Sequence, residues 1–278
     1  MKIVRTVADL RTEIAAWRAD GATVGLVPTM GGLHEGHLSL VRLAGERAER
    51  VVTTLFVNPA QFAPTEDFDA YPRTEESDRE MLESVGNGLL FAPSVAEVYP
   101  EGHSTKVHVE GLGDLLEGEF RPGFFVGVAT VVSKLLIQAM ADVAVFGEKD
   151  YQQLQVIRRM ARDLDIPTEI VGAPTVREAD GLAMSSRNRY LSADERAQAP
   201  ALHAAITAVA ATAAAGGDAE AACAAASADL LAAGFRSVDY ITLRDAETLQ
   251  SDPDPSRPRR VLGAAWMGKA RLIDNVAV

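Results

Sequence analysis

The chain has 278 residues, of which 47% are hydrophobic and 24% charged, as in ordinary globular proteins. Its formal net charge of −12 argues against nucleic-acid binding, which needs a basic surface. Cys223 is the single cysteine, so no internal disulfide can form and a reducing compartment is expected. The N-terminal residues lack the apolar core of a signal peptide, and no apolar run reaches the ~18 residues of a membrane span. We therefore expect a cytoplasmic protein without membrane contacts.

Helices and strands are predicted to alternate over the first 175 residues. The expected elements are a helix over 7–20, a strand over 23–27, a turn over 28–32, a helix over 33–50, a strand over 51–57, a long loop over 58–72, a helix over 74–85, strands over 89–92 and 105–109, a helix over 130–139, a strand over 143–146, a helix over 151–164 and a strand over 168–171. This alternation predicts an α/β fold with a Rossmann-like, doubly wound parallel sheet. Ligands of such sheets bind beyond the carboxyl ends of the strands.

The sequence changes character after about residue 175. Residues 193–233 are rich in alanine and predict a pair of helices with small side chains. Strands are expected over 238–243, 261–267 and 271–276, with a proline-rich loop over 251–260. We therefore predict two domains, a Rossmann-like nucleotide-binding domain over 1–175 and a smaller α+β domain over 176–278.

The strongest site signal lies between Val27 and Leu40, in the sequence VPTMGGLHEGHLSL. A strand leads through a glycine turn into a helix, whose N-terminus offers free N–H groups and a partial positive charge to a phosphate. His34 and His37 are three residues apart, so both imidazoles should share one face of the first turn. There they can donate hydrogen bonds to an ATP phosphate during phosphoryl transfer. The alternatives are two exposed histidines, or a zinc pair that needs a third ligand.

Two later segments carry groups that suit a nucleotide. Residues 146–153 read FGEKDYQQ, where Lys149 can meet a phosphate and Asp150 a ribose, unless they form only a charged turn. Residues 176–190 read VREADGLAMSSRNRY, where two serine hydroxyls and Arg187 suit a polyphosphate. A simple turn between domains is the alternative for this second segment.

Other polar residues are candidates for binding the substrate or a metal. Gln61 and Gln153 can form hydrogen bonds to a polar substrate. Asp67 and Asp69 could bind a metal, although a solvated acidic loop is the simpler interpretation. Asp78, in the predicted helix 74–85, is a separate candidate for Mg²⁺, which uses one or two carboxylates together with phosphate oxygens and water.

Taken together, these segments resemble the pantoate–β-alanine ligase family, the pantothenate synthetases. The match covers essentially the whole chain, in order, through PTMGGLHEGH, FVNPAQF, DAYPRT, FRPG, VFGEKDYQQL, VREADGLAMSSRNRYL and RLIDN. The resemblance implies a Rossmann domain of the nucleotidyltransferase type, related to class I aminoacyl-tRNA synthetases. It also implies a C-terminal domain that acts as a partial lid, a homodimer, and a requirement for ATP and Mg²⁺.

The resemblance further implies a reaction in two steps. The carboxylate of (R)-pantoate attacks the α-phosphorus of ATP, which gives pantoyl-adenylate and pyrophosphate. The amine of β-alanine then attacks the acyl carbon, which gives pantothenate and AMP. Adenylation is needed because a free carboxylate resists amines, and the site must keep water away from the mixed anhydride.

The resemblance assigns roles to residues at matching positions. His37, His34, Lys149 and Arg187 would be catalytic. ATP would be bound by Met30, His34, His37, Gly147, Lys149, Asp150, Val176, Met184, Ser185, Ser186 and Arg187. Gln61 and Gln153 would bind pantoate, and Asp78 would ligate Mg²⁺. One position departs from the family pattern: Phe124 stands where histidine is usual, so an altered contact from this loop is expected.

Two rival functions use the same residues. An adenylyltransferase that transfers AMP to a phosphate would also need His34 and His37. Gln61 and Gln153 favour a neutral, polyol-like acid over a phosphorylated acceptor, which would call for more arginine and lysine. A nucleotide-binding regulatory module without turnover would have no need to align Lys149 and the serine-arginine cluster on an α-phosphate.

Overall fold

The computed structural model describes residues 1–63, 68, 71–251 and 254–278. Asp67 and Asp69 lie outside the described residues. By their contacts, the described residues form two compact units, Met1–Glu148 with Gln152–Pro174, and Lys149–Tyr151 with Thr175–Val278. The domain division at residue 175 and the lid role stay predictions.

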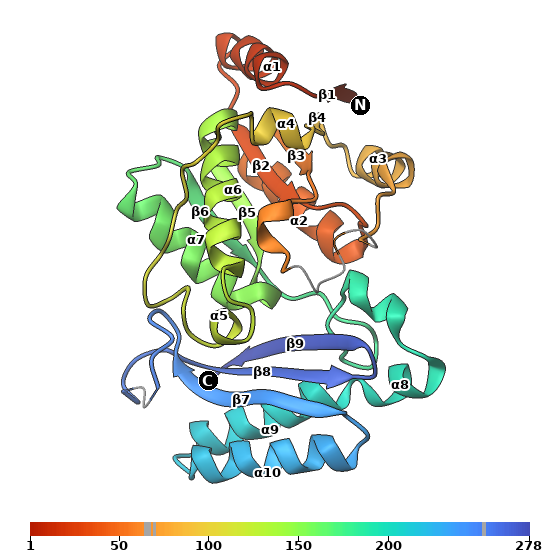
Figure 1. Cartoon of the computed structure of the whole chain (residues 1–278), viewed down its shortest axis with the longest axis vertical. Helices are drawn as coiled ribbons and strands as arrows, with labels where there is room; N and C mark the ends of the chain where they lie inside the picture. The colour runs from red at the N-terminus through yellow and green to blue at the C-terminus, as the bar shows by residue number, and fades with distance from the viewer. Residues whose placement is uncertain (64–67, 69–70, 252–253) are drawn as a thin grey trace. The chain divides into compact units, whose positions relative to one another are not determined.

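The first unit is built on a six-stranded parallel sheet (Figure 1). Its strands are Lys2–Val4 (β1), Val24–Thr29 (β2), Arg50–Leu55 (β3), Leu89–Phe91 (β4), Val143–Gly147 (β5) and Glu169–Ala173 (β6). The order is β1-β4-β3-β2-β5-β6, so the chain winds away from β2 in one direction and resumes at β5 on its other side. Such a switch point leaves a crevice beyond the carboxyl ends of the two strands, where ligands bind. The predicted doubly wound α/β fold is confirmed.

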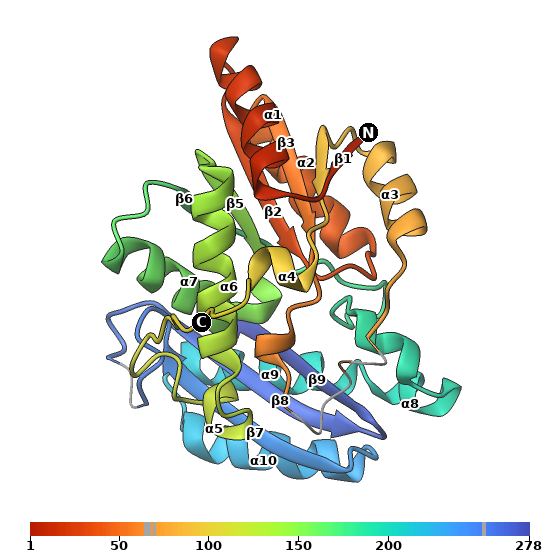
Figure 2. The same ribbon diagram turned by 45° about the horizontal axis from the view of Figure 1, so that its top comes forward.

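Helices cover both faces of this sheet (Figure 2). On one face, Glu35–Arg47 (α2) packs on β2, β3 and β5, and Glu75–Ser84 (α3) lies beside it. On the other face, Phe124–Ala139 (α6) packs on β2, and Val7–Ala19 (α1) lies beside it. Gly25 in β2 lets α2 lie close, because a Cβ there would be 3.3 Å from the carbonyl oxygen of Ala44. The remaining helices are Tyr151–Asp163 (α7) and the short elements Pro59–Gln61 (η1), Val95–Val98 (α4), Glu117–Phe120 (α5) and Glu148–Asp150 (η2).

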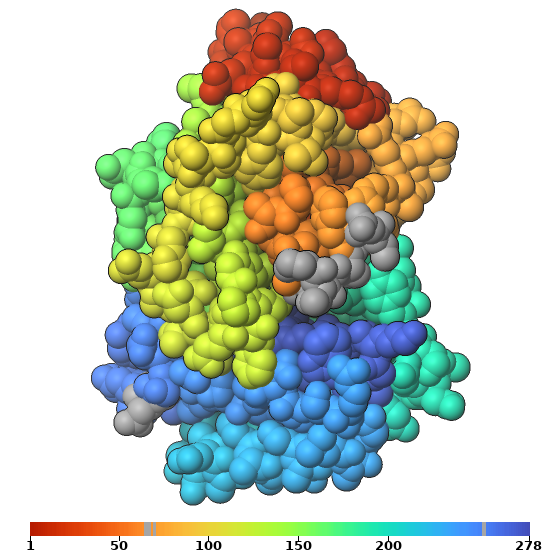
Figure 3. All heavy atoms as spheres, viewed as in Figure 1, coloured from red at the N-terminus to blue at the C-terminus, as the bar shows by residue number. Residues whose placement is uncertain are grey.

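The second unit has an antiparallel sheet in the order β7-β8-β9, with strands Ser237–Asp245 (β7), Arg259–Met267 (β8) and Ala270–Ala277 (β9). Ala201–Ala214 (α9) packs on β8 and β9, and Ala219–Ala232 (α10) packs on α9 and β7. The outer side of α10, in light blue, is visible as exposed surface in Figure 3. Two short elements, Ser186–Tyr190 (η3) and Ala193–Gln198 (α8), precede them. The predicted helix pair and three strands are confirmed.

One predicted strand is wrong, and one observed strand is missing from the prediction. Residues 105–109 form no strand, because the N–H of Val107 donates to the hydroxyl of Thr130 at 2.9 Å rather than to a neighbouring strand. Strand β1 was not predicted, since three residues are too few to show a strand pattern. It forms because it pairs with β4, a neighbour distant in sequence.

The boundaries of several predicted elements also differ. Helix α6 begins at Phe124 and not at residue 130, directly after Gly123 with φ 84°. Strand β2 extends through Pro28 to Thr29, and helix α2 begins at Glu35. Proline has no backbone N–H to donate to a neighbouring strand. Pro28 is accommodated because the pairing of β2 with β5 ends at Leu26, so β5 offers no acceptor that an N–H at position 28 would have to meet. Among the described residues, no helix has the length and apolar character needed to cross a bilayer.

Candidate active site

A buried carboxylate holds the glycine turn that follows β2. Gly31 and Gly32 have φ angles of 88° and 64°, which favour glycine. Asp78 of α3, only 2% exposed, accepts hydrogen bonds from the N–H of Gly32 at 3.0 Å and of Leu33 at 2.8 Å, one on each carboxylate oxygen. The hydroxyl of Thr74 adds a third bond at 3.2 Å. We call this arrangement the Asp78 clamp, and it fixes the path of the turn into α2.

Four backbone amides at the turn and the start of α2 already donate hydrogen bonds within the protein. The N–H groups of Gly32 and Leu33 donate to Asp78, that of His34 to His37, and that of Gly36 to His34. The prediction that these N–H groups are free to meet a phosphate is therefore wrong. For these four positions, the predicted phosphate contacts are left to the side chains, above all those of His34 and His37.

The two histidines form a reciprocal cap at the start of α2. His34 is the N-cap, and its Nδ1 accepts from the N–H of Gly36 at 3.1 Å. The Nδ1 of His37 accepts from the N–H of His34 at 3.3 Å, and the two ring centroids are 4.1 Å apart. An accepting Nδ1 carries no proton, so each neutral ring has its proton on Nε2. The cap thus gives both rings an Nε2–H donor, as the predicted phosphate contact requires.

The side chain of Gln61 is oriented by a buried amide network. Asn58, 1% exposed, donates to the Oε1 of Gln61 at 3.0 Å and to the carbonyl oxygen of Gly127 at 3.1 Å. Burial raises the pKa of Tyr99 to about 12, so its hydroxyl stays protonated and donates to Asn58 at 2.8 Å. The Nε2 of Gln61 lies 2.9 Å from the sulfur of Met30. Two residues predicted to bind different ligands, Gln61 and Met30, are therefore in contact.

Gly127→Ala is expected to disrupt this network. A Cβ at Gly127 would lie 2.2 Å from the carbonyl oxygen of Ala60 and 2.7 Å from the nitrogen of Gln61, so α6 and η1 would have to separate. We expect the free energy of unfolding to fall by about 1–3 kcal/mol, as for overpacking, with a higher KM for pantoate.

The matched control is Gly45→Ala in the interior of α2, where a Cβ would meet nothing closer than 3.9 Å. There the same change should raise stability by up to about 1 kcal/mol, because alanine is the better helix former. Denaturant unfolding of both variants measures the two changes in the free energy of unfolding. Equal effects at the two positions would contradict the proposed role of Gly127.

Phe124, the residue for which an altered contact is expected, packs against Arg121. The guanidinium of Arg121 lies 3.7 Å from the ring centroid of Phe124, a cation–π geometry. Its Nη2 also reaches the carbonyl oxygen of Gln61 at 3.5 Å, which is long for a hydrogen bond. Phe124 thus restrains Arg121 close to the backbone of Gln61.

Two predicted ATP-binding residues of the second unit, Val176 and Met184, lie at the two ends of a closed loop. The N–H of Met184 donates to the carbonyl oxygen of Val176 at 3.0 Å, which brings the two ends of this loop together. Ser185 caps the short helix η3, where its Oγ accepts from the N–H of Arg187 at 3.2 Å. The ammonium of Lys149 is 3.9 Å from the carboxylate of Asp150, a loose ion pair.

The side chains considered as metal ligands have other partners in the structure. No group of three or more His, Cys, Asp or Glu side chains among the described residues could hold an ion. A zinc pair at His34 and His37 would need a third ligand, and His108, one histidine that could be considered for it, pairs with Asp114 at 2.9 Å. Both carboxylate oxygens of Asp78 accept backbone N–H groups, so this buried side chain does not fit a Mg²⁺ ligand.

The switch-point turn and its two Nε2–H donors are typical of one class of protein, the Rossmann-like enzymes that act on nucleotides. The family model described as pantoate-beta-alanine ligase matches residues 2–277. The pantothenate synthetase of Caulobacter vibrioides is 63% identical over 279 residues, which cover 99% of this chain and 98% of that protein. The chain belongs to the pantoate–β-alanine ligase family.

Solved structures share this fold. The crystal structure of pantothenate synthetase from Thermus thermophilus has a TM-score of 0.92 and 49% identity, with 99% of both chains covered. Pantoate-beta-alanine ligase from Francisella tularensis, complexed with beta-gamma ATP and beta-alanine, has a TM-score of 0.84 and 31% identity over 100% of this chain and 97% of that one. The resemblance and the predicted ligase activity, the joining of pantoate to β-alanine, are confirmed.

Proposed function

We propose that the chain makes pantothenate through a pantoyl-adenylate, with ATP as the source of the adenylyl group. Family membership supports the overall reaction. The observation that carries the proposed mechanism is the reciprocal cap, which gives His34 and His37 their Nε2–H donors. Two such donors suit an enzyme that must stabilise negative charge on phosphate oxygens.

In the first step, a carboxylate oxygen of pantoate bonds to the α-phosphorus of ATP while the bond to the bridging oxygen breaks and pyrophosphate leaves. His34 and His37 donate to phosphate oxygens as charge builds on them. The proposed cationic contacts are Lys149 and Arg187. The other proposed ATP contacts are Met30, Gly147, Asp150, Val176, Met184, Ser185 and Ser186. Catalysis by positioning and charge stabilisation needs no covalent nucleophile from the protein.

In the second step, the neutral amine of β-alanine bonds to the acyl carbon. The carbon–oxygen bond breaks, AMP leaves with that oxygen, and the amine nitrogen loses a proton. Gln61 and Gln153 would bind pantoate through their amides, which can both donate and accept hydrogen bonds to its hydroxyl and carboxylate groups. The buried Asn58 network supports this role, because it fixes the orientation of Gln61.

We also propose that Mg²⁺ enters with the ATP phosphates and keeps water as its other ligands, as this ion usually does. In this proposal Asp78 acts on the glycine turn and not on the ion. A homodimer and a cytoplasmic location are likewise proposed, from family membership and from the single cysteine, Cys223.

Two adjacent glutamines offer a matched pair of variants. Gln153 is half-buried and forms no side-chain hydrogen bond within the described part of the chain. Gln152, 3% exposed, donates to the carbonyl oxygens of Leu112 and Leu115 and accepts from the N–H of Glu117. Gln153→Ala should raise the KM for pantoate about tenfold or more without loss of stability, because it removes a substrate hydrogen bond.

Gln152→Ala is the control. It leaves three backbone groups without their partner and should destabilise the protein by about 1–3 kcal/mol. Steady-state kinetics and thermal unfolding of both variants separate the two roles. A normal KM for pantoate in Gln153→Ala would remove this residue from the proposed site.

The direct test of the adenylate is isotope exchange. With pantoate, ATP and labelled pyrophosphate but no β-alanine, the protein should move label into ATP, and addition of β-alanine should release AMP. Exchange that does not depend on pantoate would overturn the proposal. An adenylyltransferase would instead form AMP adducts of a phosphorylated acceptor without any need for pantoate.

A further inference from the structure

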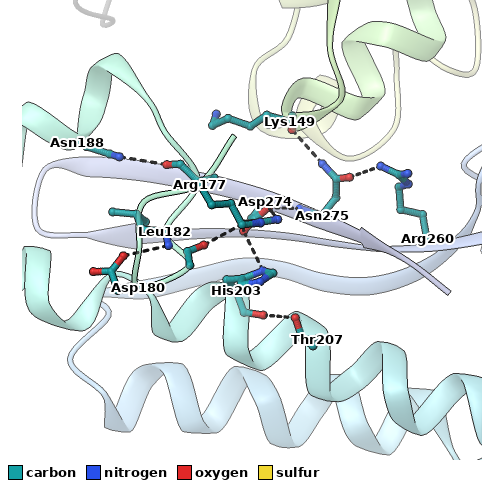
Figure 4. Close-up of polar contacts among 12 residues, drawn as sticks. Lys149, Arg177, Asp180, Leu182, Asn188, His203, Thr207, Arg260, Asp274 and Asn275 are labelled. Atoms are coloured by element: carbon teal, nitrogen blue, oxygen red, sulfur yellow. Dashed lines mark hydrogen bonds and ion pairs between the residues drawn. The ribbon is translucent and has the colours of Figure 1, made fainter. Parts of the chain in front are cut away.

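The segment RLIDN, residues 271–275, lies in β9 and has no role in the proposed reaction. Asp274 and Asn275 in this segment are only 4% and 5% exposed. Successive side chains of a strand point to opposite faces of the sheet. This dipeptide therefore reaches both sides of the β7-β8-β9 sheet, and each of its side chains meets a different segment (Figure 4).

Asp274 holds the loop that begins at Val176. Arg177 donates to the two carboxylate oxygens of Asp274 at 2.6 and 2.9 Å, a bidentate ion pair. The same guanidinium donates to the carbonyl oxygen of Gly181 at 3.0 Å, across the loop. The pair thus fixes the start of the loop, at Arg177, and its turn, at Gly181, to β9.

Arg177 supplies the charge that balances Asp274. The nearest other base is His203 of α9, whose Nδ1 lies 3.5 Å from the carboxylate but makes no hydrogen bond within the described structure. Burial, and then the positive charge of Arg177, lower the pKa of His203, with Asp274 opposing them. The imidazole is therefore neutral near neutral pH. Arg177 is then the charged partner of Asp274, and a variant that tests Asp274 has to remove this ion pair.

Asn275 holds the backbone of the Lys149 segment. Its Nδ2 donates to the carbonyl oxygen of Lys149 at 3.0 Å, and its Oδ1 accepts from Arg260 at 2.5 Å. The guanidinium of Arg260 lies 3.8 Å from the ring centroid of Tyr151. Asn275 and Arg260 together therefore fix residues 149–151 against the face of the sheet opposite to Asp274.

We propose that Asp274 and Asn275 are positioning residues for ATP. This dipeptide binds both the loop with Val176 and Met184 and the segment with Lys149, so it fixes the position of each relative to β9. Both would contact the same nucleotide, so their spacing has to match it. This inference rests on the proposed function, in which these segments bind ATP.

The test measures ATP binding by titration calorimetry together with the KM values for ATP and pantoate. Asp274→Asn keeps the shape of the side chain but removes its charge, and Asn275→Asp keeps the shape but cannot donate to Lys149. Each should raise the Kd and the KM for ATP by at least about tenfold, as loss of a charge-assisted contact implies, while the KM for pantoate stays constant. The double variant Arg177→Ala with Asp274→Asn should be no worse than either single variant, because the two residues act as one unit.

Asp239→Asn is the matched control. Asp239 accepts from Arg271 at 2.7 Å in the same sheet, and their side chains are 13% and 11% exposed. This variant should lower the melting temperature but leave ATP binding unchanged. If Asp274→Asn and Asn275→Asp behave like Asp239→Asn, the positioning proposal is wrong. If the wild-type protein neither binds ATP nor forms pantothenate, the proposed function fails and this inference fails with it.

Discussion

Replacing His37 with alanine is expected to lower kcat by roughly 10²-fold or more, as loss of one charge-stabilising donor typically does. The reason is that the Nε2–H of His37 would act where phosphate charge builds up in the first step. Its Nδ1 also accepts the N–H of His34, so alanine removes part of the helix cap as well. The measurement is steady-state release of AMP, with thermal unfolding recorded alongside to separate the two effects.

Two further variants isolate the donor. His37→Gln retains a side-chain acceptor for the cap, as glutamine does at this position of a capping box, and an amide donor in place of the imidazole. It should therefore be more stable and more active than His37→Ala. His108→Ala, at an exposed histidine that pairs with Asp114, should leave kcat unchanged. Near-normal turnover in His37→Ala would exclude His37 from the mechanism.

The second large effect is expected at Asp78. In Asp78→Asn, one amide N–H₂ faces a backbone N–H of the turn, where two donors oppose each other. We expect the free energy of unfolding, measured without ATP or Mg²⁺, to fall by about 1–3 kcal/mol for the unpaired buried group. We also expect kcat/KM to fall at least about tenfold, because the turn that carries His34 and His37 would move.

This experiment distinguishes the clamp from a metal ligand. If Asp78 bound Mg²⁺, Asp78→Asn would keep its stability in metal-free buffer, and excess Mg²⁺ would restore its activity. With the clamp, stability is lost in metal-free buffer and added Mg²⁺ restores nothing. Glu76→Gln, at an exposed carboxylate of the same helix, is the control and should change neither quantity.

The sequence predicts the alternation of helices and strands because local hydrophobic patterns decide it. Elements that form only through contacts with residues distant in sequence cannot be predicted from such local patterns. Strand β1 exists through its pairing with β4, and the N–H of Val107 bonds to Thr130 of α6, 23 residues away. Both features become visible only once the chain has folded.

The candidate site also combines features that a local sequence pattern predicts with contacts between residues distant in sequence. The histidine pair and the glycine turn are continuous in sequence, so their position at a strand end could be predicted. The Asp78 clamp joins residues 46 positions apart, and Asn275 meets Lys149 across 126 positions. No local signal reports either contact. The sequence therefore suggests a metal role for Asp78, because it shows the carboxylate but not the two amides that bind it.

The most direct test of the proposed reaction follows a single oxygen atom. Pantoate labelled with oxygen-18 in its carboxylate is incubated with the protein, ATP and β-alanine, and the AMP is examined by mass spectrometry. Attack of pantoate on the α-phosphorus predicts that AMP carries one labelled oxygen, since the bond between acyl carbon and oxygen breaks in the second step. Unlabelled AMP, with the label in pyrophosphate or phosphate, would contradict a pantoyl-adenylate.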